Sequence, residues 1–212
     1  MTQVNEFAIA RQRMVRNQIE NRDIQNPDIL AAMCKIQRHL FVTPEFHKWA
    51  YHDRPLPIDK GQTISQPYMV ALMTALLKLT PHSKVLEIGT GCGYQTAVLA
   101  EVAEEVYSVE ILPELAKSAE ARLKALNYQN IHLKQANGYF GWIEHAPYDG
   151  VVVTAAPKNI PHRLTQQLVE GGRMVIPVGS DTQELFVIQK CNGKVETTRI
   201  IGVSFVPMTG TP

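Results

Sequence analysis

Residues 85–100 read VLEIGTGCGYQTAVLA, and this stretch decides the fold. The run 84–88 is typical of a buried strand, and residues 94–102 carry apolar side chains at helical spacing. Three glycines separate the two: Gly89, Gly91 and Gly93. Glycine lets the backbone turn sharply and lets a ligand approach it closely. The stretch therefore predicts a strand, a ligand-binding turn and a helix in direct succession.

Strands and helices alternate on the C-terminal side of this turn. Further strands are predicted at 105–110, 131–134 and 149–154, and helices at 113–126 and 162–168. The last part of the chain is strand-like in three runs, at 173–179, 184–191 and 195–206. Asn192-Gly193, between two of these runs, is a strong hairpin turn signal. This order predicts an α/β fold with a mainly parallel sheet and an antiparallel element at one side.

More than 80 residues of predicted helix and loop precede the first strand of this pattern. Helices are predicted at 4–21 and 27–36, with Asn26-Pro27 as the start signal of the second. Ser65 is expected as the N-cap of a third helix that runs to about Leu79, with Pro67 in its first turn. We expect one domain over residues 1–212, in which a helical region (1–80) covers the substrate and an α/β core (81–212) binds a cofactor.

The composition argues against several functional classes. Twenty-one basic residues stand against twenty acidic ones, and the net charge of +1 disfavours binding to nucleic acid or to an anionic membrane surface. No apolar run approaches the roughly 18 residues that a membrane span requires. The N-terminus lacks the pattern of a signal peptide, so a cytoplasmic location is expected. The three cysteines form no CxxC pair and the seven histidines form no HExxH motif, so no metal site is predicted.

The glycine loop favours S-adenosylmethionine over a dinucleotide. Its glycines have the spacing GxGxG, whereas a dinucleotide site uses GxGxxG. Glu87 lies two residues before the first glycine, where it would repel a pyrophosphate but suits the ammonium and sulfonium groups of S-adenosylmethionine. Glu110 ends the next predicted strand, and a carboxylate there can accept hydrogen bonds from both ribose hydroxyls. NAD enzymes use the same device, so Glu110 indicates an adenosine without choosing the cofactor.

Six stretches of the chain closely resemble the protein-L-isoaspartate O-methyltransferase family: PLPIDKGQTISQPYMVALMTALL (55–77), VLEIGTGCGYQTAVLA (85–100), NGYFGW (137–142), VTAAP (153–157), GGRMVIPVG (171–179) and VSFVPMTG (203–210). The match runs in order through nearly the whole chain. Its GQTISQP segment is specific to that family, whereas many methyltransferases share the glycine loop. The resemblance implies a Rossmann-like class I methyltransferase, with a mixed seven-stranded sheet between helices, an N-terminal helical extension and a C-terminal antiparallel hairpin.

The resemblance also implies the activity and the site residues. Such enzymes transfer the methyl group of S-adenosylmethionine to the α-carboxyl of L-isoaspartyl residues in damaged proteins, which starts their repair and yields S-adenosyl-L-homocysteine. The active-site serine maps to Ser65, and Thr63, Gln66 and Val206 are expected on the substrate side. Cofactor contacts are expected from Ile58, Gly61, Gln62, Glu87, Gly89, Thr90, Gly91, Gly93, Glu110, Asn137, Gly138 and Thr209.

The chain departs from the family pattern at two positions near the expected site. Asn137 stands where Asp is usual, and it should weaken adenine binding without abolishing it, because an amide oxygen accepts a hydrogen bond without the help of a charge. Asp59 stands where Gly is usual. If that turn needs a positive φ, Asp tolerates it better than most residues do.

The reaction that the resemblance implies is an SN2 attack by a carboxylate, which is ionised at neutral pH and needs no general base. The protein has to align the groups and exclude water, and the Ser65 hydroxyl can orient the carboxylate by donating a hydrogen bond. The expected partners are isoaspartyl proteins and peptides, bound by a monomer. Two alternatives stay open: a small-molecule methyltransferase, which needs a closed pocket, and a binding module without turnover.

Overall fold

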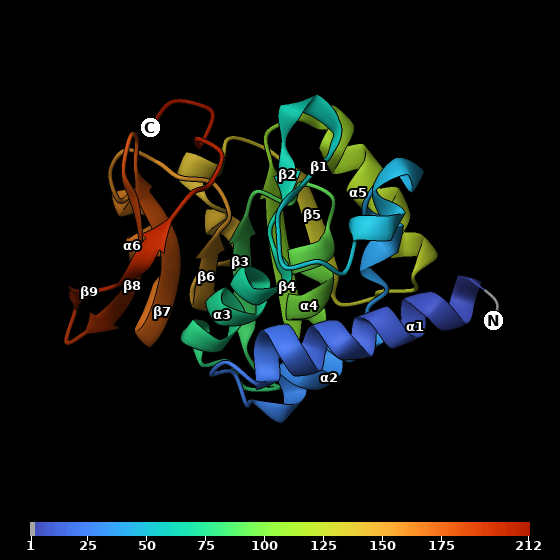
Figure 1. Cartoon of the computed structure of the whole chain (residues 1–212). Helices are drawn as coiled ribbons and strands as arrows, with labels where there is room; N and C mark the ends of the chain where they lie inside the picture. The colour runs from blue at the N-terminus through green and yellow to red at the C-terminus, as the bar shows by residue number, and fades with distance from the viewer. Residues whose placement is uncertain (1–2) are drawn as a thin grey trace.

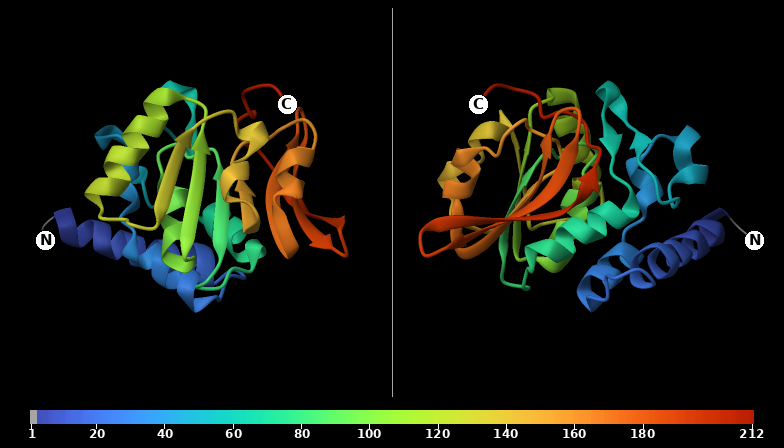
Figure 2. Two further views of the ribbon diagram at one scale, coloured as in Figure 1. Left: turned by 180° about the vertical axis from the view of Figure 1, so that it is seen from behind. Right: turned by 60° about the vertical axis from the view of Figure 1, so that its left-hand side comes forward.

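The computed structural model describes residues 3–212 and contains a seven-stranded sheet with helices packed against it (Figure 1). The strand order is β5-β4-β3-β6-β7-β8-β9. Neighbours from β5 to β7 run parallel, and β8 and β9 are added in antiparallel pairs. Helix α1 and the C-terminal strands lie at opposite sides of the molecule, and Figure 2 shows the far end of the β8–β9 hairpin projecting from the rest.

The strands of the sheet are β3 (Lys84–Ile88), β4 (Glu105–Glu110), β5 (Ile131–Gln135), β6 (Tyr148–Val153), β7 (Leu168–Gly179), β8 (Gln183–Cys191) and β9 (Lys194–Val203). The helices are α1 (Gln3–Met14), α2 (Pro27–Lys35), α3 (Pro67–Leu77), α4 (Tyr94–Val102), α5 (Pro113–Ala125) and α6 (His162–Gln166). Two short strands, β1 (Leu56–Pro57) and β2 (Thr63–Ile64), form a separate antiparallel pair. Short helical turns are η1 (Val15–Glu20), η2 (Arg38–Phe41), η3 (Pro44–Trp49), η4 (Asp59–Gly61), η5 (Gly138–Phe140) and η6 (Ile143–His145).

The predicted fold class is confirmed, including the N-terminal helices and the C-terminal antiparallel hairpin. The bounds of β3, α4 and β4 agree with the predicted strand, helix and strand. The hairpin turn has positive φ at both central residues, 52° at Asn192 and 72° at Gly193. Two positive φ values are what a type I′ turn requires, and Asn-Gly is the pair that adopts them most readily.

Helix α3 begins differently from the prediction. Its N-cap is Gln66 and not Ser65, and Pro67 is the first helical residue. The N–H of Tyr68, in the first turn, donates instead to the Asp53 carboxylate at 3.1 Å. The carboxylate of a preceding loop therefore caps this helix, and the serine hydroxyl is not used for it.

The N-terminal helix also differs, because its second half has wider turns. Residues after Met14 continue as the π-helical segment η1 and not as regular α-helix. Met14, Val15 and Ile19 are all buried there. Such turns are rare and hold more residues than a turn of α-helix, so a pattern read at 3.6 residues per turn predicts one continuous α-helix over the whole stretch.

Two apolar clusters cover the two faces of the sheet. Alternate residues of β3 point to opposite clusters, with Val85 in one and Leu86 and Ile88 in the other. Buried side chains of the N-terminal region, including Met33, join the first cluster, where α2 packs against α4. The region before β3 therefore shares a core with the sheet, as a parallel sheet buried on both faces requires. Within residues 3–212, no helix is both long enough and apolar enough to cross a membrane.

The start of α2 provides a test of the predicted cap. The Asn26 side-chain oxygen accepts hydrogen bonds from the N–H groups of Asp28 at 3.0 Å and Ile29 at 3.2 Å. Asn26→Ala should lower the free energy of unfolding by about 1 kcal/mol, because these N–H groups lose their acceptor. Urea denaturation measures the change. Asn26→Asp keeps an acceptor and should lose much less, so an equal loss in both variants would contradict the capping role.

Candidate active site

The carboxyl ends of the parallel strands meet at one edge of the sheet, and a pocket opens there. This inner pocket is lined by the glycine loop after β3 (Ile88, Gly89, Gly91), by the end of β4 and the residues after it (Val109–Leu112), by Gly138 and Thr154, and by the C-terminal segment Val206–Thr209. Ligands of open α/β sheets bind in crevices at this edge. The position of the pocket is therefore a consequence of the strand directions.

Gly89 makes the close backbone approach that its sequence pattern predicts. Its φ is 97°, and a Cβ atom at this position would collide with the hydroxyl of Thr154. That hydroxyl donates to the carbonyl of Gly89 at 2.7 Å. A second crowded glycine is Gly138, where a Cβ would collide with the side chain of Ile88. At both positions the backbone packs against a neighbouring side chain that a Cβ atom would displace, so only glycine fits there.

Glu110 enters the inner pocket at the tip of β4. One carboxylate oxygen accepts from the N–H of Gly91 at 2.8 Å, and the other accepts from the N–H of Leu112 at 3.0 Å. These bonds fix the direction of the carboxylate and bind it to the glycine loop. Each oxygen keeps a lone pair for a further donor, so the group fits the two hydroxyls of a ribose.

Glu87 does not line the inner pocket, although its place before the loop suggested a contact with a cationic ligand. The side chain is fully buried, and its Oε2 accepts from Thr96 at 2.5 Å and from Ser108 at 2.6 Å. Oε1 has no hydrogen-bond partner among the described residues. The hydroxyl of Thr90 lies 2.6 Å from that of Ser108 and extends the network. Glu87 and Thr90 thus connect β3, β4, α4 and the loop from within the protein.

A second, larger cavity adjoins the inner pocket. This outer cleft has a volume of about 940 Å³ and is open to solvent on one side. One wall comes from the segment before and within α3, including Thr63, Ser65 and Gln66, and the other from residues 180–184 and 201–205. Thr63 lines both cavities, whereas Gln62 lines only the inner pocket. The short strand β2 therefore forms the boundary between the two.

Ser65 is held in the outer cleft by its backbone. Its carbonyl accepts from Nη2 of Arg38 at 2.7 Å. Among the hydrogen bonds of residues 3–212, none involves its hydroxyl, because the N-terminus of α3 is capped by Asp53. The hydroxyl is thus free to donate to a bound group. No local sequence pattern connects Arg38 or Asp53 with Ser65, so their roles cannot be predicted from the sequence.

The other predicted site residues separate into two groups. Val206, Gly138 and Thr209 line the inner pocket. Ile58, Gly61, Gly93 and Asn137 do not line it. Ile58 lies beside the glycine loop, in a small neighbouring cavity with Gly91, and Gly93 is the N-cap of α4 with a φ of 87°. The apolar residues Ile111, Leu112 and Leu115 also line the pocket, and the sequence analysis did not single them out.

The two departures from the family pattern have structural explanations. Asn137 accepts from the N–H of Tyr139 at 3.1 Å and donates through Nδ2 to the carbonyl of Thr211 at 2.7 Å. An Asp could not make the second bond, so the amide holds the C-terminal segment beside the pocket. In the turn before β2, the positive φ values belong to Lys60 and Gly61 and not to Asp59. The backbone strain that was considered for Asp59 is therefore absent there.

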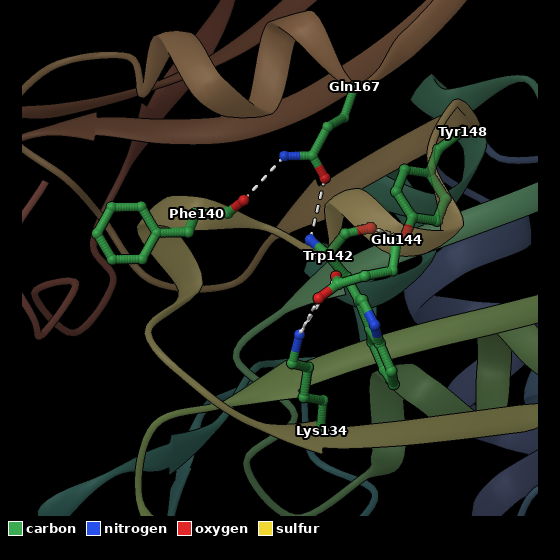
Figure 3. Close-up of polar contacts among 6 residues, drawn as sticks. All are labelled: Lys134, Phe140, Trp142, Glu144, Tyr148 and Gln167. Atoms are coloured by element: carbon green, nitrogen blue, oxygen red, sulfur yellow. Dashed lines mark hydrogen bonds and ion pairs between the residues drawn. The ribbon is translucent and has the colours of Figure 1, made fainter.

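The segment after Gly138 is fixed by polar contacts with α6 and β6 (Figure 3). The side chain of Gln167 accepts from the N–H of Trp142 at 3.0 Å and donates to the carbonyl of Phe140 at 2.9 Å. The hydroxyl of Tyr148 donates to the carbonyl of Trp142 at 2.6 Å. Gln167 is only 2% exposed, so its amide replaces solvent for these backbone groups. The contacts hold the wall that Gly138 contributes to the inner pocket.

The site combines a glycine loop after β3, an acid at the tip of the neighbouring strand β4, and an open cleft beside the pocket. These features together are typical of a class I methyltransferase. The family model described as protein-L-isoaspartate(D-aspartate) O-methyltransferase matches residues 9–212. The chain belongs to this family.

Individual relatives agree with the family assignment. The chain is 56% identical to a protein-L-isoaspartate O-methyltransferase of Picosynechococcus sp. over 94% of this chain and 90% of that one. It is 50% identical to one of Gloeobacter violaceus over 92% and 97%. A solved protein-L-isoaspartate O-methyltransferase superposes with a TM-score of 0.87 at 27% identity, covering 94% of this chain and 66% of that one. A putative one from Plasmodium falciparum, in complex with S-adenosyl-L-homocysteine, gives 0.80 at 25%, covering 94% and 98%.

The buried acid beneath the loop should make stability depend on pH. Burial raises the pKa of Glu87 to about 8, from an ordinary value of 4.5. The folded protein therefore keeps this proton in a pH range where the unfolded chain has lost it, and stability falls as the pH rises from about 5 to 8. The contribution is up to roughly 1.4 kcal/mol per pH unit. Glu87→Gln should remove it, so the variant gains stability relative to the wild type as the pH rises.

Urea denaturation of both proteins at several pH values between 5 and 8 measures this difference. Glu196→Gln, at an exposed position of β9, serves as the control for loss of a surface carboxylate. The same pH slope in the wild type and in the Glu87→Gln variant would contradict the assignment.

Proposed function

We propose that this protein transfers the methyl group of S-adenosylmethionine to the α-carboxyl of L-isoaspartyl residues in damaged proteins and peptides. The observation that carries the proposal is the arrangement of the two cavities, which meet at Thr63. A donor in the inner pocket and a peptide carboxylate in the outer cleft approach each other at that boundary. Membership of the isoaspartate methyltransferase family supports the same reaction.

The inner pocket suits the cofactor in chemistry. Glu110 would accept the ribose hydroxyls, and the backbones of Gly89 and Gly138 leave room for close contact. Gln62 and Thr209 would bound the pocket on its two other sides. When bound, the cofactor supplies an electrophilic methyl group on a sulfonium. The Glu110 carboxylate would add negative charge near this cationic group. Glu87 would act only by holding the loop from within, because burial raises its pKa to about 8 and keeps it protonated at neutral pH.

Ser65 would orient the acceptor. Ser65 lines the outer cleft, and its hydroxyl has no intramolecular partner among the described hydrogen bonds, so it can donate to one carboxylate oxygen. A neutral donor fixes the direction of the carboxylate while leaving it nucleophilic, whereas an ion pair would lower its reactivity. The only basic side chain that lines the cleft is Arg22, within the part of the chain that the structure describes. Thr63 and Gln66 would complete the wall around the acceptor.

The opposite wall offers backbone groups to a peptide. In the segment 203–208, both polar backbone groups of Phe205 are bound by the Gln183 side chain, and Ala156 pairs with Val206 and Met208. This leaves the N–H group of Ser204, which lines the outer cleft, without a partner among the described residues; that of Val206, at the inner pocket, has none there either. Backbone donors recognise an extended peptide without selecting its side chains, which fits a substrate defined only by its damaged residue.

The division into a substrate-covering region (1–80) and a cofactor-binding core (81–212) belongs to this proposal. The outer cleft supports it, because its first wall comes from residues before 80 and its second from residues after 179. The monomeric state and the cytoplasmic location stay predictions, to be tested by light scattering and by cell fractionation.

One peptide prepared in isoaspartyl and in normal aspartyl form tests the function. We expect labelled methyl groups to pass from S-adenosylmethionine to the isoaspartyl form only, because the chain of that form runs through the β-carboxyl and leaves the α-carboxyl of the residue free as the acceptor. Labelling of neither form, with cofactor binding intact, would point to a small-molecule acceptor or to a binding module.

Ser65→Ala tests the role of the hydroxyl. The variant should lose roughly 10- to 100-fold in kcat, the worth of a hydrogen bond to a charged group, while the Kd for the cofactor stays unchanged. Steady-state kinetics and calorimetry measure the two quantities. Ser180→Ala removes a hydroxyl from the opposite wall of the same cleft and is the matched control. Equal losses of turnover and of cofactor affinity would argue for a structural role of Ser65.

A further inference from the structure

Arg38 is a fully buried arginine with no acidic partner among the described residues. Its side chain has 0% exposure, and none of the ion pairs within residues 3–212 includes it. Taking a guanidinium out of water is expensive unless its N–H groups are satisfied. Here Nε and Nη2 donate to backbone carbonyls, whereas Nη1 has no hydrogen-bond partner among the described residues, which makes this side chain unusual for a core residue.

The guanidinium of Arg38 connects the two ends of the segment that carries Ser65. Nε donates to the carbonyl of Ala50 at 2.8 Å, and Nη2 donates to the carbonyl of Ser65 at 2.7 Å. Residues 50 and 65 are the two ends of an excursion that contains the β1–β2 pair and reaches the inner pocket at Gln62. One rigid planar group thus sets the distance between the two ends.

The same guanidinium contacts the helix that follows the glycine loop. Its central carbon lies 4.8 Å from the ring centre of Tyr94, the first residue of α4. Tyr94 is itself buried, and its hydroxyl donates to the sulfur of Met33 at 3.7 Å. Tyr94 comes directly after Gly93, so Arg38 touches both the serine segment and the end of the cofactor loop.

From this geometry we infer that Arg38 is a positioning residue, which holds the Ser65 segment in register with the glycine loop. The inference rests on the proposed methyl transfer, in which the acceptor orientated by Ser65 must meet a group bound at that loop. Arg38 binds the carbonyl of Ser65 and leaves its hydroxyl free, so it fixes the position of the serine without using its donor. A displacement of about 1 Å between two reacting groups can slow a reaction by about 100-fold.

Two substitutions of Arg38 distinguish a role in positioning Ser65 from a role in the stability of the fold alone. Arg38→Met keeps the apolar stem but leaves both carbonyls unsatisfied, and we expect kcat to fall about 100-fold. Arg38→Lys can donate to one carbonyl at a time and lacks the planar fork, so we expect a partial rescue, with kcat about 10-fold below that of the wild type. The cofactor Kd should stay within about threefold in both, because Arg38 does not line the inner pocket and Glu110 keeps its bonds to Gly91 and Leu112.

Arg173→Met is the matched control. Arg173 also donates to a backbone carbonyl, that of Leu76 at 3.3 Å, but it lies on β7 away from both cavities. Its loss should lower stability in urea without changing kcat per folded molecule. If Arg38→Met changes kcat no more than Arg173→Met does, or if cofactor affinity falls in step with kcat, the inference is wrong. If Arg38→Met does not fold, Arg38→Lys decides, and an unchanged kcat would overturn the inference.

Hydrogen exchange gives a readout that does not depend on activity. Peptides covering residues 50–66 should exchange faster in Arg38→Lys than in the wild type, and those in Arg173→Met should not. Unchanged exchange in Arg38→Lys would also overturn the inference. A wild-type protein that fails to methylate the isoaspartyl peptide would refute the proposed function, and the exchange data would still report on whether Arg38 holds this segment.

Discussion

The contact between Gly89 and Thr154 is the constraint on which the rest of the site depends. The Thr154 hydroxyl donates to the carbonyls of Ile88 at 3.1 Å and of Gly89 at 2.7 Å, so the end of β6 is bound to the end of β3. A side chain at position 89 would occupy the place of that hydroxyl. Because the loop must turn in this narrow space, its backbone faces the carboxyl edge of the sheet, and Gly91 comes within hydrogen-bond distance of Glu110.

Three ionisable side chains around this site, Glu87, Glu110 and Arg38, form hydrogen bonds with uncharged groups and, among the described residues, not with oppositely charged ones. Hydroxyls of Thr96 and Ser108 bind Glu87, and backbone N–H groups bind Glu110, so the described residues offer neither acid a cationic partner. The Glu110 carboxylate thus remains available to a cationic ligand, whereas burial raises the pKa of Glu87 to about 8 and keeps that acid protonated at neutral pH. On the acceptor side, the buried cation Arg38 is directed at two carbonyls. A substrate carboxylate would therefore meet a hydroxyl and not a salt-bridge partner, which preserves its nucleophilicity.

The free hydroxyl of Ser65 results from two contacts made by distant residues. Asp53 caps α3, and Arg38 takes the carbonyl of Ser65, so the serine is immobilised through its backbone alone. A serine two residues before a helix would otherwise turn its oxygen back toward the helix N–H groups. Because Asp53 provides the hydrogen-bond acceptor for the N-terminus of α3, the Ser65 hydroxyl remains available as a donor.

The amino-acid sequence by itself determined the order of strands and helices, the glycine turn, the Asn192-Gly193 hairpin and the family. These features follow from local periodicity, from the backbone freedom of glycine and from motifs of adjacent residues. Only the tertiary structure decided that Glu87 lies beneath the loop, that Asn137 binds the C-terminal segment at Thr211, and that Asp53 and not Ser65 caps α3. The reason is physical: Glu87, Asp53 and Asn137 each have a hydrogen-bond partner 9 to 74 residues away along the chain, and only the fold brings these groups together.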